Sequence, residues 1–322
     1  MEYRVKFKDF LKLVEIRTKI ASIIPFFLGI SYAIYSFGEI NLVNSTVMFF
    51  SMILLDMSVT AMNNYYDYRK AIKKEGYSYE VHNPIVKSSI GPRAAAAIII
   101  CMLMLSVALG IYLVYLTDII VLLLGIFCFA VGVMYSFGPV PISRTPFGEI
   151  FSGITMGFFI TFITIYINII DEGIIDISIR SNNLYLAMDF VSILKIAIVT
   201  APAVFSIGNI MLANNICDIK DDIENKRYTL PVFIGKDKAT FVLETLTYCS
   251  YAAIAFGVIV KALPIYSLLI YITLLFAIKN IREFAQNPTK KDTFKMIVSN
   301  CIIINVSLII SILVGLIINK LF

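Results

Sequence analysis

Nine runs of mostly apolar residues, each about as long as a membrane crossing, dominate this chain. A transmembrane helix needs roughly 20 such residues, whereas strands of an outer-membrane barrel are shorter and alternate in polarity. The sequence therefore predicts an all-α integral membrane protein, with residues 1–322 forming one transmembrane domain and no separate soluble domain. The predicted spans are Ile20–Phe37, Leu42–Met62, Ala94–Tyr115, Ile119–Phe137, Phe147–Ile170, Val191–Ala213, Ala239–Val260, Leu263–Ile278 and Met296–Ile318.

The composition excludes the other broad classes of protein. Hydrophobic residues make up 59% of the chain and charged residues 15%, against about 45–50% and about 25% in soluble domains. A soluble globular, disordered or fibrous protein is therefore excluded. The five cysteines lie in apolar runs or at the end of one, without metal-ligand spacing, which predicts buried thiols and no disulfides.

The distribution of basic residues predicts the orientation. All but four of the 27 Lys and Arg residues fall on the side of the N-terminus, the four being Arg180, Lys195, Lys261 and Lys320. Because cytoplasmic loops are enriched in Lys and Arg, we expect a multi-pass plasma membrane protein with a cytoplasmic N-terminus and an external C-terminus. This topology and the attraction to anionic lipid account for the net charge of +5, so no nucleic-acid partner is expected.

One short polar motif occurs twice. The second span ends in Asn63-Asn64-Tyr65-Tyr66-Asp67, and the sixth ends in Asn214-Asn215-Ile216-Cys217-Asp218, 151 residues later. Each copy is predicted to open a long basic loop. The repeat indicates duplication of a four-helix unit, and membrane folds of this kind often place their site at the interface of the repeats.

Helical geometry groups the acids of the second copy. Asn215, Asp218 and Asp222 share one helix face, as Asn64 and Asp67 do in the first copy, where Ala71 takes the place of Asp222. An acid inside a span usually faces the bundle interior or a wet cavity, and we expect this of Asp56.

Carboxylates and amides beside Lys226 and Arg227 indicate a site for a divalent cation and phosphate. Magnesium takes oxygen ligands and bridges carboxylates to substrate phosphates, while basic side chains contact the remaining phosphate oxygens. The alternative is that Asp67 and Asp218 cap helix ends or pair with lysines in a solvated loop. His82, the only histidine, is expected to be a solvated loop residue, with a general base as the alternative.

Three regions resemble the UbiA superfamily of intramembrane aromatic prenyltransferases. Asn63–Asp67 resembles its first aspartate-rich motif, and Asn214–Gly235, which reads NNICDIKDDIENKRYTLPVFIG, resembles its second. The third region is Tyr135–Gly157, with Tyr-x-x-Gly-Pro-x-Pro and a later Gly-Glu. The second and third regions are most similar to the branch that acts on 1,4-dihydroxy-2-naphthoate in menaquinone synthesis.

The first motif departs from the family pattern. Asn64 replaces an aspartate, a further acid is missing at Ala71, and Asn83-Pro84 replaces Arg-Pro. Glu75 or Lys87 could compensate. Each missing carboxylate removes an attraction for the cation, so Asn64→Asp is expected to lower the magnesium requirement.

The resemblance implies transfer of an isoprenyl chain from an isoprenyl diphosphate to an aromatic acceptor, with 1,4-dihydroxy-2-naphthoate losing carbon dioxide. It implies Mg²⁺ held by Asn63, Asn64, Asp67, Asp218 and Asp222, the three aspartates being catalytic. The diphosphate would be bound by Lys226 and Arg227, and Asn215 would join the substrate site. Tyr65 and Tyr135 are candidates to stabilise a carbocation through their aromatic faces.

Three alternatives stay open. Internal repeats and buried acids also fit a secondary transporter, although transporter acids lie near the membrane midplane and most of these lie at one edge. The acceptor could be 4-hydroxybenzoate, homogentisate or a haem precursor. Losses in the first motif also fit a non-catalytic relative.

Overall fold

The computed structural model describes residues 6–72, 83–87, 90–180 and 183–321. Nine helical segments within these ranges are long and apolar enough to cross a membrane, which confirms the predicted number. They are Ile16–Phe37 (η1, Ile16–Lys19, and α2, Ile20–Phe37), Leu42–Lys70 (α3), Pro92–Leu116 (α5), Ile119–Ser136 (α6), Gly148–Tyr166 (α7, Gly148–Ser152; η4, Gly153–Phe159; α8, Ile160–Tyr166), Phe190–Glu224 (α9), Lys236–Ile259 (α11), Ile265–Gln286 (η6, Ile265–Thr273; α12, Leu274–Gln286) and Phe294–Leu321 (α13).

Short elements connect the spans. The helical ones are α1 (Phe7–Leu13), α4 (Pro84–Lys87), η3 (Ile142–Arg144), η5 (Ile170–Glu172) and α10 (Leu230–Ile234). A two-stranded antiparallel hairpin, β1 (Ile175–Arg180) and β2 (Asn183–Met188), precedes α9 and was not predicted from the sequence. All five cysteines are free thiols, but only Cys301 is buried and Cys101 is exposed, so the prediction of buried thiols was wrong for most of them.

The two motif-bearing helices are longer than their apolar runs. α3 continues to Lys70 and α9 to Glu224, so both Asn-Asn-x-x-Asp motifs lie within helix. The prediction that each motif opens a loop was therefore wrong. Hydropathy marks where a helix leaves the apolar layer, but the helix ends only where its backbone hydrogen bonding stops.

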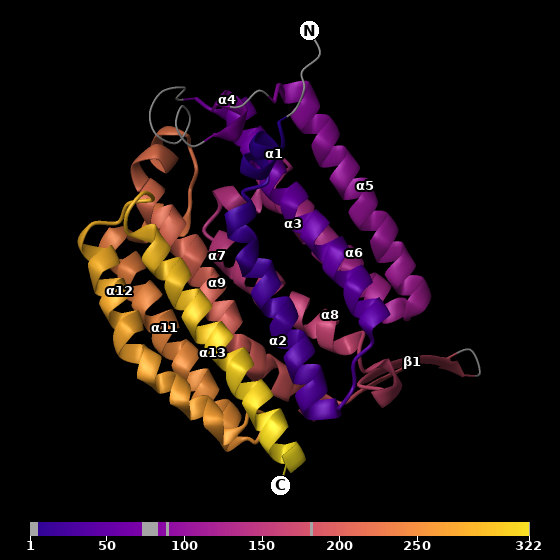
Figure 1. Cartoon of the computed structure of the whole chain (residues 1–322). Coiled ribbons are helices and arrows are strands. Elements are labelled where there is room, and N and C mark those ends of the chain that lie inside the picture. The colour runs from indigo at the N-terminus through magenta and orange to yellow at the C-terminus, as the bar shows by residue number, and fades with distance from the viewer. Residues whose placement is uncertain (1–5, 73–82, 88–89, 181–182, 322) are drawn as a thin grey trace.

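The spans form a bundle in which distant parts of the chain meet. α3 packs against α5, α9 packs against α11, and α13 contacts both α2 and α9. α1 lies at one end of the bundle and the C-terminal end of α13 at the other (Figure 1). Both motifs lie at the end near α1, because they occupy the last turns of α3 and α9.

Two glycines set the position of α9 against the fifth span. A Cβ added at Gly157 would lie 2.5 Å from the backbone nitrogen of Val204, and one at Gly153 would lie 2.6 Å from its carbonyl oxygen. Both glycines belong to the π-helical turn η4. Close backbone approach of this kind is how small residues pack membrane helices, and here it fixes the helix that carries the second motif.

Candidate active site

A large cavity opens between the two motif-bearing helices. Its volume is about 1220 Å³. Around the last turns of α3 and α9 its wall is polar and charged, whereas Met48, Met52, Leu113 and Ile163 belong to its apolar part. The three predicted catalytic aspartates, Asp67, Asp218 and Asp222, all line this cavity, as the repeat led us to expect.

The end of α9 turns Arg227 back toward the helix. Arg227 N–H donates to the Asp222 carbonyl (2.8 Å) and Lys226 N–H donates to the Ile223 carbonyl (3.2 Å), which together form a Schellman motif. Lys226 adopts the left-handed conformation that this motif requires (φ 53°). Glycine is the usual residue at that position, so the sequence contained no clear signal for where α9 ends.

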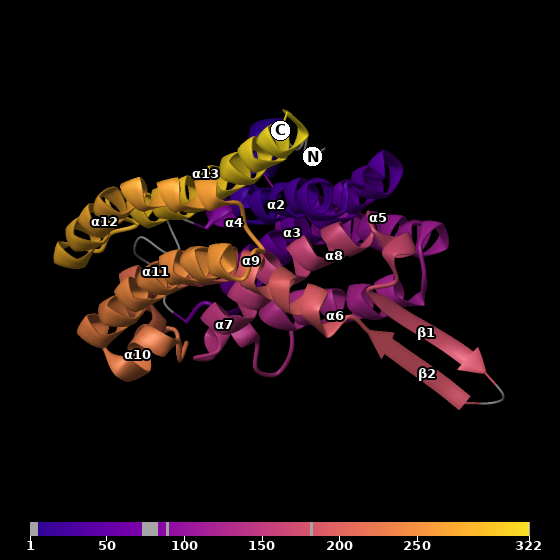
Figure 2. The ribbon, with the colours of Figure 1, turned by 90° about the horizontal axis from the view of Figure 1, so that it is seen from below.

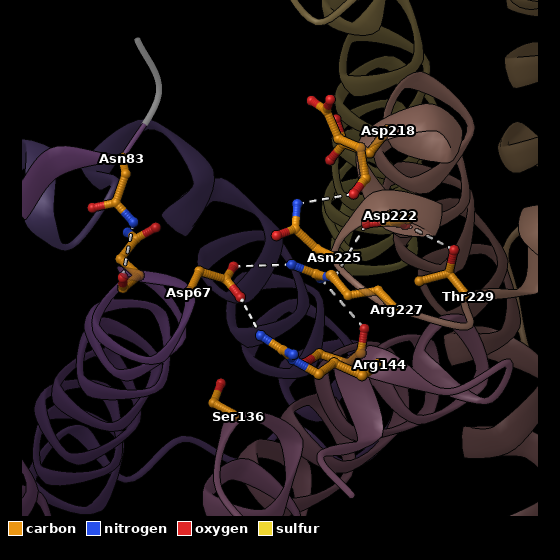
Figure 3. Close-up of polar contacts among 12 residues, drawn as sticks. Asp67, Asn83, Ser136, Arg144, Asp218, Asp222, Asn225, Arg227 and Thr229 are labelled. Carbon is orange, nitrogen blue, oxygen red and sulfur yellow. Dashed lines mark hydrogen bonds and ion pairs between the residues drawn. The ribbon is translucent and has the colours of Figure 1, made fainter. Parts of the chain in front are cut away.

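Arg227 joins the two motifs (Figure 3). Its Nη1 contacts Asp67 Oδ2 at 2.9 Å, and its Nε lies 3.2 Å from Asp222 Oδ1. The second oxygen of Asp67 pairs with Arg144 Nη2 at 3.3 Å, and Thr229 donates to Asp222 Oδ2 at 2.9 Å. Asp67 and Asp222, 155 positions apart in the chain, are therefore held by one guanidinium.

Neighbouring carboxylates determine the charge of Arg227. Burial alone would lower its pKa, but Asp67, Asp222 and Asp218 together raise the pKa above its usual value. Arg227 thus stays cationic at any accessible pH. A permanently charged guanidinium at the polar end of the cavity is suited to bind phosphate oxygens.

The loop between α12 and α13 supplies positive charge that the sequence did not assign to the site. Lys290 Nζ lies 2.5 Å from Asp218 Oδ2, and Lys290 and Lys291 line the cavity together with Lys295 in the first turn of α13. Arg144 was also missed, although it lies inside the Tyr135–Gly157 segment and is the only basic residue of its loop. The lysines carried no motif that could have identified them.

The remaining predicted residues divide into two groups. Asn63, Asn64 and Tyr135 line the cavity, whereas Lys226, Asn215 and Tyr65 do not. Lys226 is exposed; Asn215 is buried and donates to Glu149 Oε1 (2.8 Å); Tyr65 packs beside Tyr66. The Tyr135 hydroxyl is buried and has no hydrogen-bond partner among the described residues.

Asn64 has a structural contact that the sequence did not predict. Its amide nitrogen donates to the Leu13 carbonyl and to Glu15 Oε1, both at 3.1 Å, and so ties the N-terminal segment to α3. Asn83, in place of the family's arginine, donates to the backbone carbonyl of Asn64 at 3.0 Å. His82 and Glu75 lie outside the described residues, as does the side chain of Lys87.

Replacing Asn64 by Asp is therefore expected to destabilise the protein. The variant loses both donors and places a carboxylate beside Glu15, which we expect to cost about 1–3 kcal/mol. Thermal unfolding in detergent would measure the loss, with Asn63→Asp at the adjacent cavity-lining position as the control. Equal stability of the two variants would contradict this assignment, and a magnesium titration of Asn64→Asp would test the benefit expected from the sequence.

Asp56 is a partnered acid inside a span. It lines the cavity, as predicted for an intramembrane acid, and Lys19 Nζ lies 2.6 Å from its Oδ1. Ser22 donates to its other oxygen at 2.6 Å, and Lys19 also donates to Thr60. Lys19, counted from the sequence among the cytoplasmic residues, is 1% exposed and neutralises this acid within the bundle.

Fold and site together define a class of protein: a multi-pass membrane protein whose helices enclose a cavity, with carboxylates and cations at one end and apolar walls beyond. The chain matches the UbiA prenyltransferase family over residues 22–319, and it belongs to that family. This membership confirms the resemblance drawn from the motifs and overturns the transporter alternative.

Individual relatives agree in sequence and in fold. The 1,4-dihydroxy-2-naphthoate octaprenyltransferase of Bacillus subtilis (strain 168) is 25% identical over 276 residues, which cover 86% of this chain and 82% of that protein. A UbiA homologue from Aeropyrum pernix K1 superposes with a TM-score of 0.66 at 19% identity, covering 89% of this chain and 97% of that one. A UbiA homologue from Archaeoglobus fulgidus, solved with GPP and Mg²⁺, gives a TM-score of 0.65 at 16% identity and covers 96% and 99%.

Proposed function

We propose that this protein transfers an isoprenyl chain from an isoprenyl diphosphate to 1,4-dihydroxy-2-naphthoate. The observation that carries the proposal is that the cavity has a charged end and apolar walls. An isoprenyl diphosphate likewise has a charged diphosphate at one end and an apolar chain. The Bacillus subtilis relative supports the choice of acceptor. The reaction forms a carbon–carbon bond between the isoprenyl group and the ring, releases diphosphate, and loses the acceptor's carboxyl group as carbon dioxide.

The cationic side chains account for binding of the diphosphate. Arg227, Arg144 and Lys290 already contact carboxylates at the polar end of the cavity. Phosphate oxygens can accept hydrogen bonds from these cations in place of the carboxylates, and the cations need not leave the polar end of the cavity. The apolar walls hold the chain and exclude water, and the Tyr135 ring lines the same cavity, where its face can stabilise a developing carbocation.

The carboxylates fit magnesium in chemical kind. Asp67, Asp218 and Asp222, with amide oxygens of Asn63 and Asn64, offer the hard oxygen ligands that Mg²⁺ prefers, and the bound ion would neutralise charge on the departing diphosphate. No three His, Cys, Asp or Glu side chains in the described ranges converge closely enough to hold a metal by themselves. The substrate diphosphate would then complete the coordination shell, as in many magnesium sites.

Activity is accordingly expected to require a divalent cation. Excess chelator should abolish turnover, and added Mg²⁺ should restore it, because without the cation the carboxylates of the site would repel the diphosphate instead of helping to neutralise its charge. The measurement is the initial rate in proteoliposomes before and after chelation. Full turnover in excess chelator would contradict the role given to the aspartates.

The proposed acceptor is tested by a panel. Membranes containing the protein are supplied with Mg²⁺, a labelled isoprenyl diphosphate, and 1,4-dihydroxy-2-naphthoate, 4-hydroxybenzoate or homogentisate in turn. We expect a prenylated product and carbon dioxide only with the naphthoate. Product with another acceptor would reassign the substrate, and consumption of no acceptor would favour a non-catalytic relative.

A further inference from the structure

The hairpin between the fifth and sixth spans has one apolar face and one polar face. Its register pairs Ile175 with Met188 and Ile177 with Leu186, while Asp176 pairs with Ala187 and Ser178 with Tyr185. Directly opposed residues of antiparallel strands lie on the same side of the sheet. The isoleucines therefore share a face with Met188 and Leu186, and Leu184 follows on that face two residues away.

The base of the hairpin fixes which way these faces point. Asp189 N–H donates to the Ile174 carbonyl at 2.8 Å, and the Tyr166 hydroxyl donates to the Ile175 carbonyl at 3.4 Å. Ile175 and Ile177 are partly buried against the main hydrophobic core of the bundle. At the base of the hairpin the apolar face is therefore turned toward the core. The apolar residues farther along the strands lie on that same face.

Beyond the base, the apolar face extends past the bundle. Leu184 is 70% exposed, Leu186 59% and Met188 52%. Figures 1 and 2 show the hairpin projecting sideways from the helices, near the bundle end opposite α1. Phe190 and Val191, at the start of α9, are exposed beside it, so the apolar surface of the hairpin continues into the exposed apolar surface of a span.

We infer that this hairpin lies on the membrane interface with its apolar face in the lipid. The exposed apolar side chains of the hairpin continue into those at the start of α9, and the hairpin projects sideways from the bundle. Both observations favour lipid as the partner of the apolar face. A second copy of the chain is a poor alternative, because two strands of this length offer roughly 200 Å² of face, far below the ~800 Å² per partner of a stable interface. The polar face, with Asp176 and Ser178, is left toward water.

The chain contains no tryptophan, so a single introduced Trp reports on one position. Leu186→Trp probes the apolar face, and Tyr185→Trp, one residue away on the opposite face, is the matched control. Each variant is reconstituted in nanodiscs with one copy per disc, and its fluorescence is quenched either by phosphatidylcholine brominated on its acyl chains or by aqueous iodide. Leu184→Trp and Asn183→Trp form a second pair in case the first does not fold.

We expect bromolipid to quench Leu186→Trp several-fold more than Tyr185→Trp, and iodide to show the reverse order. Equal quenching of the two variants by iodide would overturn the inference. Protection from iodide that arises only in discs containing two copies would also overturn it, in favour of self-association. The test uses no substrate, so its outcome is independent of the proposed reaction.

Discussion

Replacing Asp218 by Asn is expected to lower turnover at least about 100-fold while leaving the fold intact. The large effect follows because removing a group that stabilises charge on a transferring diphosphate typically costs two to three orders of magnitude. The small structural effect follows because the structure pairs Asp218 with Lys290, and the amide oxygen of an asparagine can still accept a hydrogen bond from that lysine. Initial rates with labelled isoprenyl diphosphate and saturating Mg²⁺ measure the first effect, and thermal unfolding measures the second.

Asp237→Asn is the matched control for this change. Asp237 is an exposed aspartate in the first turn of α11, outside the cavity lining. It should retain the rate of the unmodified protein. If Asp218→Asn also keeps that rate, Asp218 is neither a metal ligand nor a contact of the diphosphate.

Replacing Arg227 by Gln is expected to damage both stability and substrate binding. Asp222 is 3% exposed, and without the guanidinium its carboxylate is left buried with Thr229 as its remaining hydrogen-bond donor among the described residues. Breaking a buried pair from one side costs about 3–5 kcal/mol. The KM for isoprenyl diphosphate should rise as well, because a cation at the polar end of the cavity is lost. Thermal unfolding and a substrate titration measure the two effects separately.

Lys226→Gln provides the comparison for Arg227→Gln. The sequence places both basic residues at the diphosphate, whereas the structure turns Lys226 outward at the end of α9. We expect its replacement to change neither the stability nor the KM appreciably. A rise in KM equal to that of Arg227→Gln would show that the sequence assignment of Lys226 was correct and that the loop rearranges on binding.

The membrane fold could be predicted because each span must satisfy its backbone hydrogen bonds within an apolar layer of fixed thickness. The boundaries were less accurate for α3 and α9, whose last turns are polar but still helical. The hairpin was missed, although Ile175, Ile177, Leu184 and Leu186 alternate with polar or small residues as half-buried strands do.

The candidate site was partly predictable for a similar reason. The repeated motif identified Asp67 and Asp218, helical spacing added Asp222, and all three line the cavity. The partners of these acids, Arg144, Arg227 and Lys290, come from three separate loops. The spacing of residues in the sequence does not show which loop packs against which helix end.

The sequence by itself determined the number of spans, the all-helical membrane class and the acids of the two motifs, because these follow from local apolar length and helical periodicity. Only the tertiary structure decided that Arg227 rather than Lys226 reaches the cavity, that Lys290 meets Asp218, and that Asn64 anchors the N-terminal segment. Those outcomes depend on a left-handed residue at the end of α9, on glycines that let α9 approach its neighbour, and on loop packing, so they are fixed by long-range contacts.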